Sequence, residues 1–339
     1  MVLLTGATGY TGSHMAARLS RLGARVRAIA RPTSDTSALS AFPIDWHIGE
    51  MTDAALVKKA VTGVNVVMHL ASSYRETFSS IRAQRDVHIN GTKRLAEYAS
   101  LQPDFRRFVH VSTVGVHGHI EQPPADETYR FSPGDDYQRT KLEAEQWIME
   151  YGRETGLPVT TVRPAAIYGP GDRRLLKLFR MAKYPIVPLV GGGQCLYHLV
   201  HVDDMVDFMA CAAVHPKAVQ EAFICGGREP ITIEEIISTV GRCYGVNNRF
   251  IRVPTAPLMA LAKLCDMICS PLQIRPPLHP RRIAFFTKDR AFNTSKMESL
   301  LGFQAQVDNR TGLEQTAAWY ARHDWIRVRR APVMAVRPA

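Results

Sequence analysis

Short runs of apolar residues alternate with longer stretches of mixed character through the first half of the chain. The short runs predict buried β-strands. The longer stretches repeat apolar residues every three or four positions, as amphipathic helices do. Strands and helices alternating at this spacing predict an α/β fold with a doubly wound parallel sheet. The expected strands are 2–5, 25–30, 45–48, 65–70, 107–112 and 158–163, and the expected helices are 11–22, 54–61, 87–100 and 137–152.

The regular alternation ends after Pro164. Three consecutive glycines at 191–193 and prolines at 185 and 188 mark loops. Helical periodicity then resumes, which predicts a smaller C-terminal α/β domain that holds a substrate. We expect a dinucleotide-binding domain over 1–168 with 195–226 returning to it, a substrate domain over mainly 169–326, and a basic flexible tail over 327–339. The helices expected in this half are 202–214, 232–244, 257–269 and 312–323.

Composition is that of an ordinary globular protein, with 46% hydrophobic and 22% charged residues in 339. The net charge of +11 attracts acidic or phosphorylated ligands, but no basic run is interleaved with aromatic residues, so a nucleic-acid partner is not expected. None of the six cysteines forms a CxxC pair or a zinc-like cluster with histidines, so no metal site is predicted. Reduced cysteines, no long apolar span and no room for a signal peptide before Gly6 predict a cytoplasmic protein.

A glycine-rich loop separates the first strand from the first helix. Glycines at 6, 9 and 12 allow a tight turn, close approach of the backbone to a pyrophosphate, and close packing of helix on strand. Amides at the helix start can then bind the anion. This loop predicts a Rossmann fold with a bound nicotinamide dinucleotide, contacted by Gly6, Thr8, Gly9, Tyr10, Thr11 and Gly12.

The residue after the second strand indicates which dinucleotide is bound. Folds that prefer NAD usually place an acidic residue there, which binds the adenosine ribose hydroxyls. This chain has Arg31 instead, and a guanidinium can pair a 2′-phosphate through two hydrogen bonds. We therefore expect NADP(H) to be favoured over NAD(H). The alternative interpretation is that Arg31 is simply an exposed surface residue.

Further motifs follow along the chain. They are His69-Leu70-Ala71, Tyr137 and Lys141 four residues apart, Arg163-Pro164 with a Tyr-Gly-Pro-Gly-Asp stretch at 168–172, and His-Val-Asp-Asp at 201–204. With the glycine loop they make the chain resemble the extended short-chain dehydrogenases/reductases, the NAD-dependent epimerase/dehydratase family, over about residues 1–326. The segment Phe285–Asn293, with Ser295-Lys296 and Leu301-Gly302-Phe303, resembles the 3β-hydroxysteroid dehydrogenase-like members.

The resemblance implies a catalytic set of Thr113, Tyr137 and Lys141. Tyr137 takes the family's role of general acid and base. A nearby ammonium group and the positive nicotinamide ring both favour its phenolate, whose ordinary pKa is about 10. Lys141 also holds the nicotinamide ribose, and Thr113 hydrogen-bonds the reacting oxygen. The remaining cofactor contacts that the resemblance implies are Glu50, Met51, Leu70, Ala71, Ser72, His88, Ser112, Pro164 and Ala165.

Four positions depart from the family pattern. His88 stands where an asparagine is usual, and Glu50 replaces an aspartate that meets the adenine amine. On the substrate side, Ala166 stands where sugar-nucleotide enzymes commonly carry asparagine, and Tyr197 where they commonly carry arginine. Both missing groups normally contact the nucleotide of the substrate, although other arginines, such as Arg173, Arg174 or Arg275, are available in this half of the chain.

Three functions are therefore considered. The first is an NADP-dependent oxidoreductase that moves a hydride between nicotinamide and a ketone or secondary alcohol of an apolar small molecule without a nucleotide. The second is a nucleotide-sugar epimerase or dehydratase, and the third a non-catalytic NADP-sensing regulator; retention of both Tyr137 and Lys141 argues against the third. The apolar helix 257–269 packs in the core, walls an apolar pocket or touches a membrane surface. A homodimer is compatible with the sequence.

Overall fold

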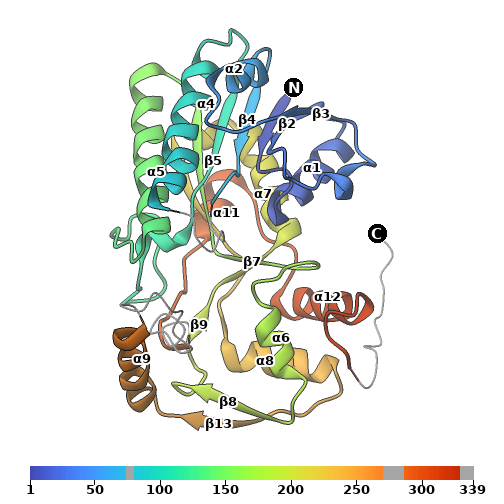
Figure 1. The fold of residues 1–339 in the computed structure, drawn as a ribbon, viewed down its shortest axis with the longest axis vertical. Helices are drawn as coiled ribbons and strands as arrows, with labels where there is room; N and C mark the ends of the chain where they lie inside the picture. Colours follow the sequence, from blue (N-terminus) through green and yellow to red (C-terminus); the bar gives the residue numbers. More distant parts are fainter. Residues whose placement is uncertain (74–79, 270–285, 329–339) are drawn as a thin grey trace.

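The computed structural model describes residues 1–73, 80–269 and 286–328. Its centre is a seven-stranded sheet in the order β11-β6-β5-β4-β1-β2-β3, and every neighbouring pair is parallel (Figure 1). The predicted α/β architecture is confirmed. The strands are β1 (Val2–Thr5), β2 (Val26–Ala30), β3 (Ile44–Ile48), β4 (Val66–His69), β5 (Arg107–Val111), β6 (Val159–Pro164) and β11 (Glu221–Cys225).

Helices cover both faces of this sheet, which is why its strands are apolar at consecutive positions. Leu3 and Leu4 point to opposite faces, and both are fully buried. Burying a leucine side chain contributes about 1.5–3 kcal/mol. One face packs against α1 (Tyr10–Arg21) and α7 (Val202–Val214), and the other against α2 (Ala54–Val61), α4 (Gly91–Ser100) and α5 (Asp136–Thr155).

A second apolar core lies beyond the carboxyl ends of the strands, in the lower half of Figure 1. Around it are α6 (Leu176–Ala182), α8 (Ile233–Cys243) and α12 (Asn309–Arg322). Three two-stranded sheets complete this half: β7 (Ala166–Tyr168) with β10 (Leu199–His201), β9 (Leu196–Tyr197) with β12 (Ile231–Thr232), and β8 (Ile186–Val190) with β13 (Arg249–Val253). Helix α9 (Thr255–Cys269) follows β13.

The chain returns to the large sheet after leaving it. Strand β11 adds to the edge beside β6, and α11 (Ser295–Leu301) packs near β11, where Lys296 Nζ donates to the carboxylate of Glu221 at 2.7 Å. The division of the chain at residue 168 into two domains stays a prediction.

Predicted and observed elements differ mainly where a capping residue sets the start of a helix or where a strand is very short. The helix predicted over 87–100 is preceded by α3 (Ile81–Arg85) and a π-helical turn (Asp86–Asn90), because the Ser80 hydroxyl caps the chain earlier, accepting from Ala83 N. Similarly, Asp308 caps α12, which therefore begins at Asn309, three residues before the predicted start. Sequence periodicity missed α6, α11 and the short strands. Within the described residues, no helix combines the length and apolarity needed to cross a membrane.

Candidate active site

The glycine loop forms a cradle that side chains would fill. Gly6 has φ +75°, and a Cβ built on it would lie 2.8 Å from Ala71 N. A Cβ on Gly12 would lie 2.0 Å from the carbonyl oxygen of Gly6. Gly9 precedes α1 and caps it without a side-chain hydrogen bond, and the first turn carries no acidic residue. The first amides of α1 are thus arranged as an anion site, which fits the pyrophosphate of a dinucleotide.

Thr5 and His69 hold this cradle at the ends of β1 and β4. Ala71 N donates to Thr5 Oγ1 at 3.2 Å, and the same hydroxyl is hydrogen-bonded to His69 Nδ1, 2.7 Å away. His69 is fully buried, and desolvation, with the nearby Lys141 charge, lowers its pKa to about 3. The neutral imidazole therefore links the ends of β1 and β4, next to the predicted cofactor contacts Leu70 and Ala71.

The predicted adenine-side contacts lie at the neighbouring strand ends. Arg31 directly follows β2, Glu50 lies two residues after β3, and both are exposed. Met51 is buried, and a Cβ on Gly91 at the start of α4 would lie 3.4 Å from its Cε. Because the carboxyl ends of neighbouring parallel strands meet at one edge, Arg31 and Glu50 are placed where a ribose and adenine of a dinucleotide would lie.

Tyr137 and Lys141 lie one turn apart in α5, whose start is capped by the Asp135 carboxylate accepting from Gln138 N. Lys141 is buried, and its Nζ donates to the carbonyl of Val111, the last residue of β5, at 2.8 Å. Desolvation lowers the pKa of Lys141 to about 8, and the charge of Glu145 partly opposes this shift. The lysine ammonium therefore lies against the carboxyl end of β5, and Tyr137 is half-buried.

His88 packs against Tyr137, with ring centroids 5.5 Å apart. Ser73 N donates to His88 Nε2 at 3.1 Å, which requires the ring proton to sit on Nδ1. Nδ1 then donates to Thr140 Oγ1 at 2.8 Å, and Thr140 Oγ1 donates to the carbonyl of Tyr137 at 3.1 Å. Burial, with the charge of Lys141, lowers the pKa of His88 to about 2. Sequence reasoning left the role of His88 open and did not single out Thr140.

Thr113 begins the short 3₁₀ turn Val114–His117 after β5 and caps it by accepting from Gly115 N at 3.1 Å. The turn packs on the start of α5, because a Cβ on Gly115 would lie 3.1 Å from Gln138 Cγ. The neighbouring Ser112 hydroxyl is buried and has no hydrogen-bond partner among the described residues. The sheet edge therefore brings Thr113 and Ser112 toward the helix that carries Tyr137.

A further histidine, His110, went unnoticed in the sequence. It is fully buried in β5 beside His69, with ring centroids 5.8 Å apart, and neither ring nitrogen has a partner among the described residues. Desolvation, followed by the charge of Lys141, holds its pKa well below the ordinary value of 6.5. The only signal in the sequence was a histidine inside an otherwise apolar strand.

The Arg163-Pro164 motif has an observed structural contact. Arg163 forms a buried ion pair with Glu145 of α5, with Nε donating to Oε1 at 2.8 Å. This pair ties β6 to α5 below the catalytic candidates. Pro164 ends β6, and Ala165 N donates to the carbonyl of Cys225 on β11. Pro164 and Ala165 therefore lie at the carboxyl ends of the strands, as the glycine loop does.

On the expected substrate side, a guanidinium lies beside the position where the family's arginine is missing. Arg290 Nη1 donates to Tyr197 Oη at 2.9 Å, and the guanidinium lies 5.1 Å from the centre of the tyrosine ring. Arg173 instead lies over the Trp325 ring, and Arg174 bonds Asp172 and the carbonyl of Ile167. Arg275 and Phe285 lie outside the described residues.

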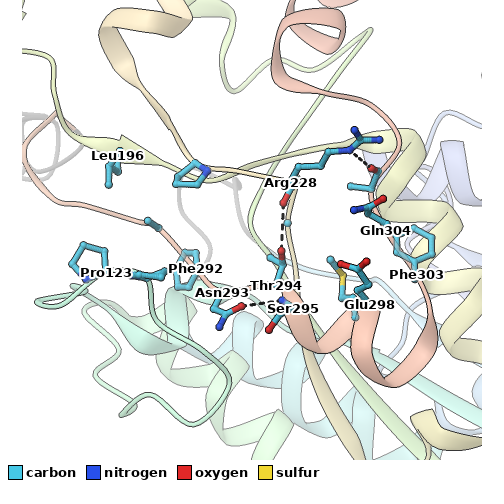
Figure 2. A pocket seen from close by; sticks show the side chains of 17 residues that line it. Pro123, Leu196, Arg228, Phe292, Asn293, Thr294, Ser295, Glu298, Phe303 and Gln304 are labelled. Atoms are coloured by element: carbon cyan, nitrogen blue, oxygen red, sulfur yellow. Dashed lines mark hydrogen bonds between the residues drawn. The ribbon is translucent and has the colours of Figure 1, made fainter.

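A pocket of about 530 Å³ opens beside the end of β11. Figure 2 shows Phe292, Asn293 and Ser295 on one wall and Arg228 on another, with Arg228 Nε donating to the carbonyl of Ala305 at 2.7 Å. None of Thr113, Tyr137 and Lys141 lines it. The pocket is displaced by two strands from β5, so it is not the place where chemistry at Tyr137 would occur. Part of the segment that resembles hydroxysteroid dehydrogenases lines this pocket.

The titratable side chains show no alternative metal chemistry in the parts of the chain that are described. There, no group of three or more His, Cys, Asp or Glu side chains is arranged to hold a metal ion. All six cysteines are free thiols, and burial raises the pKa of Cys195 to about 12 and that of Cys243 to about 11. The Cys195 and Cys243 thiols are therefore protonated at neutral pH and are poor nucleophiles.

The chain is similar in sequence and in fold to proteins of one known family. The model of the NAD dependent epimerase/dehydratase family matches residues 2–226. Sterol demethylase protein B of Methylococcus capsulatus (strain ATCC 33009 / NCIMB 11132 / Bath) is 36% identical, covering 96% of this chain and 99% of that protein. 3beta-hydroxysteroid-dehydrogenase/decarboxylase isoform 1 of Arabidopsis thaliana is 25% identical, covering 93% of this chain and 78% of that protein. Among solved structures, MoeE5 in complex with UDP-glucose and NAD has a TM-score of 0.73 at 22% identity, over 95% of this chain and 99% of that one.

Proposed function

Because the chain belongs to the NAD dependent epimerase/dehydratase family, we propose that it is an NADP-dependent oxidoreductase acting on a sterol-like secondary alcohol or ketone. The observation that carries the proposal is the similarity over almost the whole chain to two proteins named for sterol or hydroxysteroid chemistry. The substrate-side residues agree with it. Ala166 offers no side-chain hydrogen bond, and an apolar substrate in a closed site would leave extra polar groups unpaired at a cost in affinity.

Each residue of the site has a separate role in the proposed hydride transfer. The nicotinamide cofactor, when bound, supplies or accepts the hydride. In the oxidation direction, Tyr137 as phenolate takes the hydroxyl proton of the alcohol while the carbinol carbon loses the hydride, leaving a ketone. The Lys141 ammonium stabilises the phenolate by its charge. Thr113 hydrogen-bonds the reacting oxygen, and His88, through Thr140, keeps the first turn of α5 in place.

Lys141 suits this role in its charge and its position. Its Nζ donates one hydrogen bond to Val111, which leaves two of its three donors for the cofactor ribose and the phenolate. With a pKa of about 8, the ammonium form still predominates at neutral pH. A buried cation next to a phenol is worth more than an exposed one, because the surroundings screen it less.

Cofactor preference is tested at Arg31. We expect the native protein to bind NADPH more tightly than NADH, because the exposed Arg31 guanidinium can pair the 2′-phosphate. Arg31→Asp should reverse the preference, measured as two dissociation constants. Arg25→Asp is the matched control, since it makes the same charge change at the opposite end of β2 and should leave both constants unchanged. NADH binding in the native protein as tight as that of NADPH would contradict the preference.

A second candidate function is favoured by one contact. The guanidinium of Arg290 at Tyr197 restores a positive charge beside the position where sugar-nucleotide enzymes carry arginine. A nucleotide-sugar epimerase or dehydratase therefore stays as the alternative. Arg290→Met separates the two functions. It should weaken binding of a nucleotide sugar at least tenfold if that is the substrate, and change turnover of an apolar alcohol little if it is not. Assembly as a homodimer also stays a prediction.

A further inference from the structure

Helix α9 presents its apolar face to solvent. Leu261, Leu264 and Ile268 follow one another at three and four residues and therefore share one side of the helix. Their exposed fractions are 50%, 47% and 54%, and that of Met267 is 66%. Ala262, on the opposite side, is the buried residue of the helix. This is the reverse of an ordinary surface helix, whose apolar stripe faces the core.

The β8–β13 ribbon adds a second exposed apolar surface. In its parallel register, Ile186 pairs with Arg249 and Pro188 with Ile251, so these four side chains share one face. Ile186 and Ile251 are each 56% exposed, whereas Val187 and Leu189, on the other face of β8, are buried. The outward face of the ribbon is thus apolar with an arginine at its edge.

The two surfaces belong to one end of the molecule. Helix α9 starts two residues after β13, and a Cβ on Gly191, next to β8, would lie 3.2 Å from Thr255 Cγ2 at the start of α9. Figure 1 shows all three elements at the end farthest from the seven-stranded sheet. The described residues include fourteen exposed large hydrophobic side chains, and seven of them gather here: Tyr184, Ile186, Ile251, Leu261, Leu264, Met267 and Ile268. An accumulation of this kind marks a contact surface.

The charges at this end of the molecule indicate which kind of partner binds there. Segments 183–190 and 249–269 carry four basic residues and one acidic residue: Lys183, Arg249, Arg252, Lys263 and Asp266. A second copy docking through the same surface would bring these basic groups against each other. A bilayer with anionic headgroups accepts apolar side chains and basic groups together. We propose that this tip surface, formed by β8, β13 and α9, docks the protein on an anionic membrane surface.

The proposed docking is peripheral. Helix α9 has 15 residues, too few to cross the hydrocarbon core, so it would lie along the interface with its apolar face down. The inference rests on exposure and charge and does not need the proposed substrate. It adds a route by which an apolar substrate dissolved in a bilayer reaches the protein without crossing water.

The test is co-sedimentation of the full chain with vesicles. We expect binding to phosphatidylcholine vesicles containing phosphatidylglycerol, at least tenfold stronger than to phosphatidylcholine alone and weakened by salt. Leu264→Glu with Ile268→Glu should reduce this binding at least tenfold. Leu101→Glu with Val214→Glu is the matched control at side chains that are 73% and 78% exposed elsewhere, and it should bind like the native protein. Arg249→Gln with Arg252→Gln should remove the preference for phosphatidylglycerol.

Circular dichroism and the unfolding temperature check that each variant is folded, and the NADPH dissociation constant is measured beside vesicle binding. If the native protein binds NADPH but does not bind anionic vesicles, the docking proposal is overturned and the proposed function is not. Equal binding to neutral and anionic vesicles also overturns it. A native dimer that Leu264→Glu with Ile268→Glu dissociates, without vesicle binding, would show a second copy on the tip surface. That result contradicts the proposal.

Discussion

The Nδ1 atom of His88 lies 2.8 Å from Oγ1 of Thr140, the residue that immediately precedes Lys141. The same imidazole accepts a hydrogen bond from Ser73 N through Nε2. His88 thereby links the chain after β4 to the first turn of α5. It does so with both ring nitrogens, one accepting and one donating, in a single neutral tautomer.

The first prediction concerns this link. His88→Ala should lower kcat roughly fivefold, because loss of one hydrogen bond costs about 1 kcal/mol. It should also lower the free energy of unfolding by about 1–3 kcal/mol, since Ser73 N is left without its acceptor. His88→Asn should recover most of kcat but less of the stability. Steady-state kinetics and urea unfolding measure the two effects, and an alanine variant with native kcat would remove the positioning role.

The second prediction concerns Lys141. Its folded-state pKa of about 8 lies below the ordinary 10.5, so the buried ammonium opposes folding below pH 8. As the pH rises from 8 to 10.5, the folded protein has lost its proton while the unfolded chain still holds one. The free energy of unfolding should therefore rise by up to about 3 kcal/mol relative to Lys141→Met.

Unfolding of the native protein and of both variants, Lys141→Met and the exposed control Lys263→Met, tests this at several pH values. The difference between native protein and Lys141→Met should grow above pH 8, whereas Lys263→Met should follow the native curve. A parallel course of the native and Lys141→Met curves would mean that Lys141 is not held at the lowered pKa.

The third prediction concerns acid stability. The pKa values of His69 (about 3), His88 (about 2) and His110 (well below 6.5) are lowered mainly by burial. At these three histidines the unfolded chain takes up one proton each as the pH falls below 6.5, and the folded chain does not. Stability is therefore complete above pH 6.5 and is lost below it, at up to about 1.4 kcal/mol per pH unit for each histidine.

His110→Phe isolates one of these protons, because neither ring nitrogen has a partner among the described residues. The variant should lose stability less steeply below pH 6 than the native protein, by about one proton's share. His119→Phe, at an exposed position, should leave the slope unchanged. If His110→Phe follows the native slope, His110 takes up its proton in the folded state.

Much of the fold follows from local patterns. Six of the seven strands of the large sheet were predicted within about two residues, because each is a short apolar run between turn residues, whereas β11 was not predicted as a strand. The glycine loop was also predictable, since steric needs at Gly6 and Gly12 leave a sequence signature. The early start of the helix before 87 was not, because it depends on a cap at Ser80 and a π-helical turn rather than on apolar periodicity.

Contacts across long separations explain what the sequence could not predict. Arg290 contacts Tyr197 across 93 positions. The sequence showed that an arginine is absent at position 197, but it could not show that the guanidinium of Arg290 lies there instead. Lys141 and Val111 are 30 positions apart, and only folding shows that the ammonium is buried against the end of β5. His110 looked like one polar residue in an apolar strand, and its position beside His69 depends on strand pairing.

The central claim is hydride transfer at Tyr137 with an apolar substrate. The most direct measurement offers the native protein NADP⁺ with a sterol 3β-alcohol and, separately, NADPH with UDP- and dTDP-sugars and with apolar ketones, following reduced nicotinamide by absorbance and binding by calorimetry. We predict turnover of the apolar alcohol and ketone, weak binding of the nucleotide sugars, and a loss of roughly 10²–10⁴ in rate in Tyr137→Phe with cofactor binding retained. Micromolar binding of a nucleotide sugar with no turnover of any apolar alcohol or ketone, or native turnover by Tyr137→Phe, would contradict the account.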